Sequence, residues 1–437
     1  MKESKHSTSE VVAVAQQKLR GNKVFDPADI KHMLAILGQR FGLEICLGHP
    51  EAVEHVEYGV ASHLRICLAT TEDRTWSFTS YPSEPFLSCI AASILHGSID
   101  TLRTCLQSLQ KKVYNGMIST GQAGELASRM LWLLAKDLFV RAEGKNLFFD
   151  ASSKPTWSAI LNDCRAIPLM SYLKHVFGKR DWPPEALKAF ENAYINFSHW
   201  LEMDNNIGTK DEHAVRCDLL VDSGFSETLT NTSSEVWTLR HWKRTSALQC
   251  CHNQPAVDKM IPIYFKPKAG SSAQGRVSQI FISDKARSKG SQTELRYINR
   301  RDSSIKCGSP DSPYVVILVD LSLPEHAFEA SWKKVDTDDT YSLRIYAAGM
   351  NTTTFPFLTN HPYIVETLQR ITSPPKSPAQ EGLQDKMRFG STRTERHLFW
   401  EIGNENGNMI LEERTDGEPK SVDEKEGTNE AMHDEGD

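Results

Sequence analysis

Two short β-rich runs in the second half of the chain constrain its fold more than any other feature. Val257 to Phe265 and Val277 to Ser283 are rich in isoleucine, valine and aromatic residues, and the stretch from Lys266 to Gly275 between them is rich in Gly, Ser and Lys. In the first run Ile261 and Ile263 alternate with residues of the other face, which is the period of a strand. Two such runs around a polar, glycine-containing stretch predict a hairpin.

Further runs extend this hairpin into a sheet. Tyr314 to Val319 is continuously apolar, which predicts a strand buried on both faces, and Tyr341 to Ala347 alternates as a strand does. Helix signals dominate before residue 205. We expect helices from Asp26 to about Gly42, from Pro85 to Leu95, from Ser98, from Gly121, over Pro168–Gly178, from Pro183 to Met203 and over His361–Ile371, with one more strand over Ala61–Thr70.

The chain is therefore predicted to be a mixed α+β protein. A disordered stretch over residues 1–24 precedes a mainly helical region over 25–118. A core over residues 119–372 holds the sheet and a helical insertion at about 155–205. The polar and charged composition of residues 373–437 predicts a mostly disordered acidic tail.

Composition limits the class of protein. No apolar run approaches the 18 or so residues that a membrane span needs, so no membrane association is expected. The first residues are polar, and no apolar segment of a signal peptide follows them. The nine cysteines are scattered and form no CxxC pair. We therefore expect an intracellular protein, cytoplasmic or nuclear, with reduced thiols.

Charge is unevenly distributed along the chain. Residues 401–437 hold 13 acids and 3 bases, whereas residues 240–306 hold 14 bases and 4 acids. Interleaved bases and aromatic rings in the basic stretch are suited to phosphate contact and base stacking. An amphipathic helix with buried tryptophans would give the same pattern. The candidate residues for binding nucleic acid, DNA or RNA, are Arg240, Trp242, Lys243, Arg244, Arg287 and Lys289.

The hairpin, the buried strand and a helix with a glutamate resemble the core of the PD-(D/E)XK, or restriction-endonuclease-like, superfamily. The chain is similar to a group of uncharacterised fungal proteins with such a domain, which accompany ATPase-bearing, mobile-element or effector-like systems. The matching segments are Tyr81–Pro85, Gly124–Arg129, His199–Asp204 and His241–Asp258. The resemblance implies a restriction-endonuclease-like mixed sheet, and it implies a separate ATPase-bearing protein as a partner.

The resemblance also implies roles for three residues. Asp258 matches the acid of the first motif, Lys285 matches the lysine of the second, and Glu125 is the candidate helix glutamate that assists metal binding. Mg²⁺ takes one or two carboxylates together with phosphate oxygens, and it activates a bound water. The implied function is a Mg²⁺-dependent nuclease, or its catalytically inactive derivative, acting on nucleic-acid phosphodiesters.

The chain departs from the family pattern at one position. The pattern requires Asp, Glu or Gln two residues before the lysine, and Ser283 stands there. Asp284 is the substitute metal ligand, but it points to the opposite face if the strand is regular, unless a β-bulge turns it inward. An interaction protein without enzymatic activity, which binds nucleic acid or a protein partner, is the alternative function.

Overall fold

The structure is a computed structural model of the whole chain. It describes residues 8–21, 24–46, 49–70, 77–121, 124–143, 161–202, 234–250, 256–267, 275–285, 290, 292–299, 312–335 and 340–372. Both the predicted acidic tail over residues 373–437 and the first seven residues lie outside these ranges.

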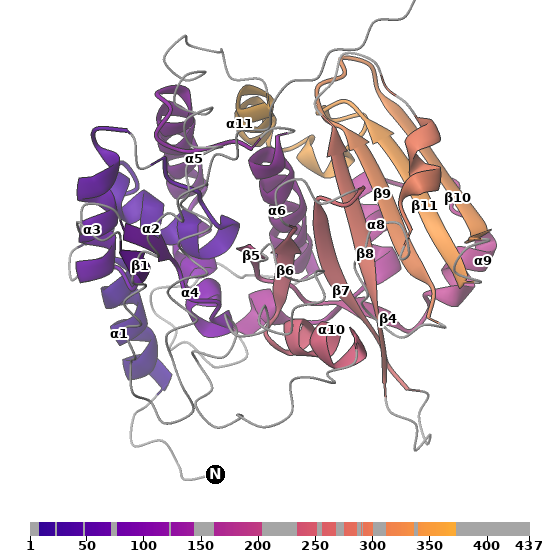
Figure 1. Ribbon diagram of the computed structural model, residues 1–437, viewed down its shortest axis with the longest axis horizontal. Coiled ribbons are helices and arrows are strands. Elements are labelled where there is room, and N and C mark those ends of the chain that lie inside the picture. Colours follow the sequence, from indigo (N-terminus) through magenta and orange to yellow (C-terminus); the bar gives the residue numbers. More distant parts are fainter. Residues whose placement is uncertain are drawn as a thin grey trace, which may run out of the picture.

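The N-terminal part is a layer of helices on one side of the molecule (Figure 1). A small antiparallel pair of strands lies at its edge. The elements are α1 (Thr8–Leu19), α2 (Ile30–Phe41), α3 (Ala52–Ser62), α4 (Pro85–Leu95) and α5 (Ile99–Tyr114), with β1 (Ile66–Thr70) and β2 (Ser77–Ser80). Helix α6 (Glu125–Glu143) runs between this layer and the sheet (Figure 1).

Two boundaries in this layer differ from the predicted ones. Helix α2 is capped by Asp29, whose carboxylate accepts from the Lys31 backbone N–H, and not by Asp26. Its predicted end at Gly42 is confirmed, because that glycine adopts φ +63° and closes the helix. The prediction of disorder over residues 1–24 is wrong for α1, whose Val12 and Leu19 are buried in the main core.

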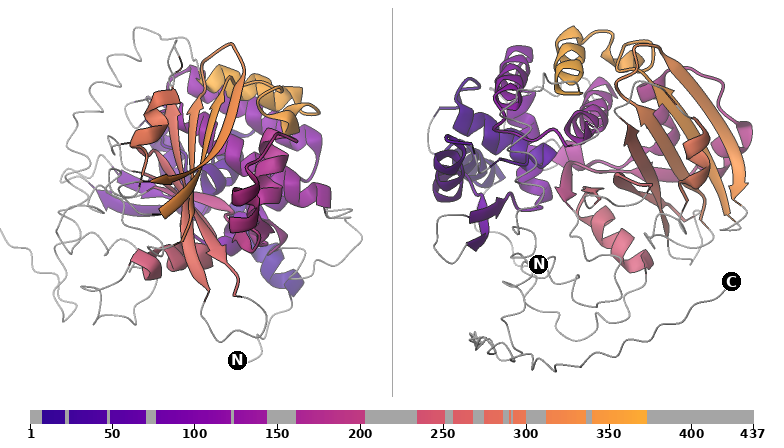
Figure 2. Two further views of the ribbon diagram at one scale, coloured as in Figure 1. Left: turned by 90° about the vertical axis from the view of Figure 1, so that its right-hand side faces the viewer. Right: turned by 45° about the horizontal axis from the view of Figure 1, so that its top comes forward.

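A large mixed sheet forms the other half of the molecule (Figures 1 and 2). Its main path runs in the order β10-β11-β9-β8-β7-β4-β3, and β5 and β6 branch from β7. The strands are β3 (Ile167–Pro168), β4 (Ala193–Ile195), β5 (His199–Glu202), β6 (Ser246–Gln249), β7 (Lys259–Phe265), β8 (Arg276–Lys285), β9 (Tyr314–Asp320), β10 (Ala327–Val335) and β11 (Thr340–Ala348). Strands β6, β7 and β8 are antiparallel, whereas β9 is parallel to both β8 and β11.

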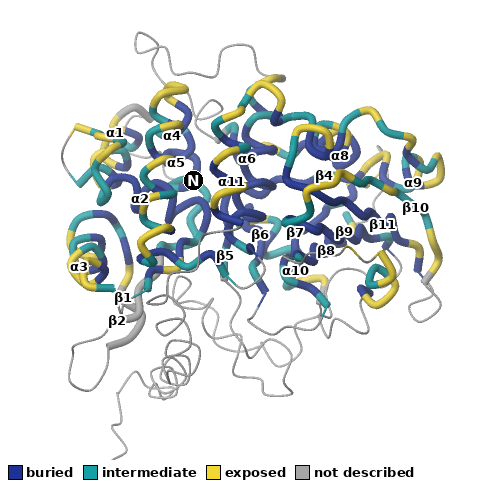
Figure 3. Tube along the Cα trace, turned by 90° about the horizontal axis from the view of Figure 1, so that it is seen from above, coloured by how far each residue is buried: buried dark blue, intermediate teal, exposed yellow. Residues whose placement is uncertain are grey.

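The two faces of this sheet pack against different elements. Ile282 and Ile317 belong to the main core, together with side chains of α6 and of α8 (Leu169–Phe177). Phe281 and Val316 belong to a second cluster, covered by α10 (Ser234–Lys243) and by the 3-10 helix η4 (Gln292–Tyr297). Both faces are therefore buried, as the continuous apolar run of β9 predicts, and Figure 3 shows the inner strands in dark blue.

The predicted helix from Pro183 to Met203 is wrong. Helix α9 (Pro184–Ala189) ends after six residues, and the chain then adds β4 and β5 to the sheet. Ala193 pairs with Phe265 of β7, and Ile195 pairs with Ile167 of β3. The apolar residues of this stretch have a helical spacing, but pairing with β7 overrides that local preference. The predicted helical insertion at about 155–205 is therefore partly strand.

The predicted mixed α+β class is confirmed. Helix α8 and helix α11 (Pro362–Thr372) lie where helices were expected, and β7, β8, β9 and β11 lie where strands were expected. The predicted strand over Ala61–Thr70 is shorter, because α3 continues to Ser62. No single described helix is long and apolar enough to cross a membrane; only α4 and α5 together, which bend by 105° where they meet, reach that length and composition.

Candidate functional site at the ends of strands β7 and β8

The two predicted catalytic positions lie at the same edge of the sheet. Asp258 directly precedes β7, and Lys285 is the last residue of the antiparallel neighbour β8. Lys259 lies opposite Ile282 in the register, which places Asp258 opposite Ser283. The backbone N–H of Asp258 donates to the carbonyl of Ile282 at 2.9 Å and continues the pairing. The hairpin geometry therefore brings the two motifs together.

Asp258 is held against the end of β8 by two hydrogen bonds. Its Oδ2 accepts from the backbone N–H of Asp284 at 2.7 Å and from the Ser283 hydroxyl at 3.3 Å. Strand alternation places Lys285 on the same face as Ser283. Asp258, Ser283 and Lys285 thus lie on the same face at this end of the hairpin. The catalytic roles of Asp258 and Lys285 stay a prediction.

Asp284 points to the opposite face, as it does in a regular strand. The pairing of β8 with β9 continues to Lys285 without a register shift, and its pairing with β7 is regular up to Ile282, so there is no bulge. The Asp284 carboxylate accepts from the Ser128 hydroxyl of α6 at 2.7 Å, and it forms an ion pair with the Lys259 ammonium. All three side chains are fully buried.

Lys259 of this ion pair also interacts with the charges of Asp258 and Glu125. Burial lowers the pKa of Lys259 to about 8, and the negative charges of Asp258 and Glu125 oppose that shift. Sequence reasoning did not identify Lys259, because its neighbour Asp258 matched the motif and the lysine itself did not. Strand alternation combined with the position of Asp284 is the signal that could have found it.

Glu125 begins helix α6 close to the same place. The preceding Gly124 adopts φ +77°, which glycine does readily, and turns the chain into the helix. Three residues later Ser128 contacts Asp284, and Glu125 is close enough to Lys259 to affect its pKa. Glu125 therefore lies near Lys259 on the α6 face of the sheet, and its role in metal binding stays a prediction.

These side chains do not fit the predicted Mg²⁺ site. Mg²⁺ requires carboxylate oxygens that converge on one octahedron. Asp284 faces α6 with its carboxylate shared between Ser128 and Lys259, and the neutral Ser283 stands beside Asp258. Among the described residues, no three Asp, Glu, His or Cys side chains are grouped so that they could hold a metal ion. Asp258 and Asp284 thus lie on opposite faces of the sheet, and their carboxylates do not converge on one metal ion.

Four of the six predicted nucleic-acid-binding residues lie on α10 or directly after it. Trp242 stacks on Tyr264 of β7, with ring centroids 5.2 Å apart and an interplanar angle of 23°. Lys243 is exposed and Arg240 is half-buried, whereas Arg244 donates to the Ser83 carbonyl at 3.1 Å. The tryptophan therefore packs against the sheet, and the basic side chains supply the exposed surface. Arg287 and Lys289 lie outside the described residues.

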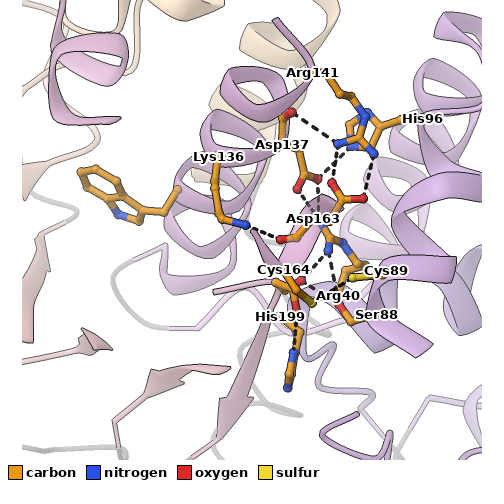
Figure 4. A network of polar contacts seen from close by, with 12 residues as sticks. Arg40, Ser88, Cys89, His96, Lys136, Asp137, Arg141, Asp163, Cys164 and His199 are labelled. Atoms are coloured by element: carbon orange, nitrogen blue, oxygen red, sulfur yellow. Dashed lines mark hydrogen bonds and ion pairs between the residues drawn. The ribbon is translucent and has the colours of Figure 1, made fainter. Parts of the chain in front are cut away.

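A second polar cluster is buried between α2, α4 and α6 (Figure 4). The Arg40 guanidinium donates to both oxygens of Asp137 at 2.5 Å, and His96 Nε2 contacts the same carboxylate at 2.8 Å. Arg40 and Asp137 are fully buried, and the charge of Arg40 holds the pKa of Asp137 well below its usual range against the effect of burial. This ion pair joins α2 to the middle of α6.

The same cluster continues toward the sheet through short hydrogen bonds. Lys136 donates to the carbonyl of Asp163, and Arg141 pairs with the Asp163 carboxylate at 2.6 Å. Ser198, just before β5, accepts at its carbonyl from Arg40. Sequence reasoning missed this network. Its signal is the charged Lys136–Asp137 pair in the middle of an otherwise apolar helix, which requires buried partners.

The comparisons with known proteins reach the helical half only. Residues 12–148 match a family model described as a domain of unknown function, DUF8736. This region runs from within α1 to just beyond α6, so it includes Glu125 and Asp137 but neither Asp258 nor Lys285. Neither a curated protein nor a solved structure matches the chain.

Proposed function

We propose that the protein binds nucleic acid through a PD-(D/E)XK-like core that has lost metal-dependent cleavage. The observation that carries this proposal is the buried ion pair between Lys259 and Asp284. This ion pair holds the Asp284 carboxylate, the substitute metal ligand, on the face of the sheet that packs on α6. The site at the end of β8 is then left with Ser283 at the position where the family has a second ligand.

The topology supports the nuclease-like part of the proposal. An antiparallel meander of β6, β7 and β8 is followed by the parallel neighbour β9, and α6 packs on one face. The glutamate at the start of α6 lies near Lys259, the residue that follows Asp258 at the start of β7. These are the elements on which the resemblance to the superfamily rests.

The loss of cleavage follows from charge and geometry. A phosphodiester site must neutralise developing negative charge and generate a hydroxide, which Mg²⁺ does when carboxylates hold it. Asp258 has the neutral Ser283 hydroxyl opposite it, and the nearest further carboxylate on that strand points away. A weak, neutral ligand in place of an acid lowers the affinity for the metal, so cleavage is not sustained.

Basic side chains on and after α10 provide the binding surface. Lys243 is exposed on the helix, and Arg240 and Arg244 are half-buried near it. Each lysine or arginine that neutralises a phosphate releases counterions, so the affinity falls with salt. DNA and RNA are both candidate ligands, and a separate ATPase-bearing protein is the proposed partner from the family resemblance.

Binding is tested by fluorescence anisotropy with single- and double-stranded DNA and RNA over a series of salt concentrations. We expect log affinity to fall linearly with log salt, and we expect Lys243→Gln to reduce the slope by about 0.9 for a lost phosphate contact. The matched control is Lys333→Gln, an exposed lysine on β10, which should leave the slope unchanged. Absence of salt-dependent binding to any of these ligands would reject the proposal.

Cleavage is tested on the same preparations with Mg²⁺ or Mn²⁺. Wild type, Asp258→Ala and Lys285→Ala should all leave the nucleic acid intact while binding it. Cleavage by wild type that both substitutions abolish would establish an active nuclease instead.

An interaction protein is the second candidate, and one feature of the helical half favours it. A groove with a volume of about 680 Å³ lies between α5 and α11. Its lining includes Arg103, Lys111 and Arg370, together with Tyr114, which is 65% exposed. A protein partner that binds in this groove should no longer bind the Tyr114→Ala variant, whereas nucleic-acid binding by this variant should persist.

A further inference from the structure

Two cysteines that are distant in the sequence meet at the junction of the helical layer and the sheet. Cys89 lies inside α4, and Cys164 ends the 3-10 helix η1 (Leu161–Cys164), which leads into β3. Their sulfur atoms are 2.9 Å apart, although the residues are separated by 75 positions. A disulfide bond requires about 2.05 Å between the sulfurs, so closing it needs a movement of about 0.9 Å.

The surroundings differ between the two sulfurs in a way that suits thiol chemistry. Cys164 is partly exposed, and its sulfur lies 3.4 Å from the Thr245 hydroxyl. The hydrogen bond from Cys89, with that from Thr245 and the nearby Lys136 charge, lowers the pKa of Cys164 to about 6 despite burial. Cys89 is fully buried, and its pKa is raised well above the ordinary value. The lowered pKa of Cys164 and the raised pKa of Cys89 favour the thiolate form of Cys164, with the Cys89 thiol in contact with it.

Two other described cysteines, Cys46 and Cys105, do not share these features. Burial raises the pKa of both Cys46 and Cys105 to about 12, so these thiols stay protonated at neutral pH. Thiolates are the reactive form of cysteine. The asymmetry and the short contact therefore single out the pair in α4 and η1.

We propose that Cys89 and Cys164 form a redox modification site, which hydrogen peroxide or an organic peroxide closes to an intramolecular disulfide bond. The proposal is independent of nucleic-acid binding. Its geometry is that of a partly exposed, attacking cysteine with a resolving cysteine already in contact.

The reaction has two steps with balanced atoms. The Cys164 thiolate attacks one peroxide oxygen and breaks the O–O bond, which gives a sulfenic acid on Cys164 and hydroxide, protonated to water. The Cys89 sulfur then attacks the Cys164 sulfur, displaces the sulfenic hydroxyl as a second water and releases its own proton to that leaving group. Two thiols are oxidised by two electrons in total, and one hydrogen peroxide is reduced to two waters.

The bond would fasten α4 to the start of the sheet. Cys89 follows Ser88, whose hydroxyl donates to the Ser198 carbonyl just before β5 at 2.7 Å. Cys164 follows Asp163, which is bound to Lys136 and Arg141 of α6. A disulfide here would add a covalent link to a junction that the buried charges already hold together (Figure 4).

The test uses the full-length reduced protein, treated with a small excess of hydrogen peroxide and then alkylated and digested. We expect a peptide pair joined through Cys89 and Cys164, which dithiothreitol separates. Before oxidation, alkylation of Cys164 at pH 7 should be at least about tenfold faster than that of Cys46, because only the former is largely thiolate.

Variants distinguish the roles of the two sulfurs. Cys89→Ser should leave a Cys164 sulfenic acid that a dimedone probe traps, whereas Cys164→Ser should yield neither trapping nor a disulfide at this site. Cys46→Ser is the control and should form the disulfide as wild type does. Separate alkylation of Cys89 and Cys164 in peroxide-treated wild type would overturn the proposal, and that result does not depend on whether a variant folds.

Discussion

The ion pair between Lys259 and Asp284 makes the sharpest quantitative prediction. Both side chains are fully buried, and Ser128 supplies one further hydrogen bond to the carboxylate. Removal of one partner of a buried pair leaves an uncompensated charge and typically costs ~3–5 kcal/mol. We therefore expect Lys259→Met and Asp284→Leu each to lower the free energy of unfolding at pH 7 by about that amount.

The double variant behaves differently. Lys259→Met with Asp284→Leu replaces both charges by apolar groups of similar size, which is often neutral or stabilising. We expect its free energy of unfolding to lie within about 1 kcal/mol of wild type or above it, so that the double-mutant cycle gives a coupling of at least ~5 kcal/mol. Urea unfolding followed by circular dichroism measures all four proteins.

An exposed pair in the same chain provides the control. Lys31 and Glu54 are 3.1 Å apart, but their side chains are 26% and 75% exposed. A cycle on this pair should give about 0–1 kcal/mol. If the Lys259–Asp284 cycle gave a coupling as small as this control, the two charges would not be buried against one another, and the reasoning about the site would be refuted.

Three further predictions concern the first residue of β5 and two residues of the helical half. His199 is fully buried, and burial together with the Arg40 charge lowers its pKa to about 3. Below pH 6.5 the histidine is therefore protonated in the unfolded chain, whereas in the folded protein it stays neutral until about pH 3. Stability should therefore fall as the pH falls through this window, by about 2 kcal/mol at pH 5, and His199→Gln should remove that share of the pH dependence in urea unfolding. Asp137→Asn should cost ~3–5 kcal/mol, because it leaves the buried Arg40 guanidinium without its counter-charge; a loss below about 1 kcal/mol in thermal or urea unfolding would contradict the network. Asp29→Ala should cost about 1 kcal/mol by removing the cap of α2, whereas the same change at the exposed Asp100 should cost less; equal losses would contradict the capping role.

Strand patterns in the second half of the sequence predicted much of the sheet. The alternation of β7 and the continuous apolar run of β9 are local signals, and both strands form where they were expected. The short strands β3, β4 and β5 could not be predicted in this way, because pairing with β7 and β6 decides their conformation. Strand β10, whose edge position gives it a mixed composition, was also missed.

The candidate site was predictable only as far as local patterns extend. Alternation along a hairpin predicts that Asp258 lies opposite Ser283 and that Asp284 points to the other face of the sheet. The pairing of Asp284 with Lys259 and Ser128 depends on the register of two strands and on the placement of α6, and the sequence does not display either. The meeting of Cys89 and Cys164 across 75 residues is hidden for the same reason.

Metal binding at the end of β8 tests the central claim most directly. Mn²⁺ substitutes for Mg²⁺ at oxygen-ligand sites, and its free form gives an electron paramagnetic resonance signal that decreases on binding. Titration of the full-length protein with Mn²⁺, alone and with saturating nucleic acid, should give the same curve for wild type and for Asp258→Ala. Stoichiometric binding by wild type that Asp258→Ala abolishes would show that a metal site exists after all, and it would contradict the account.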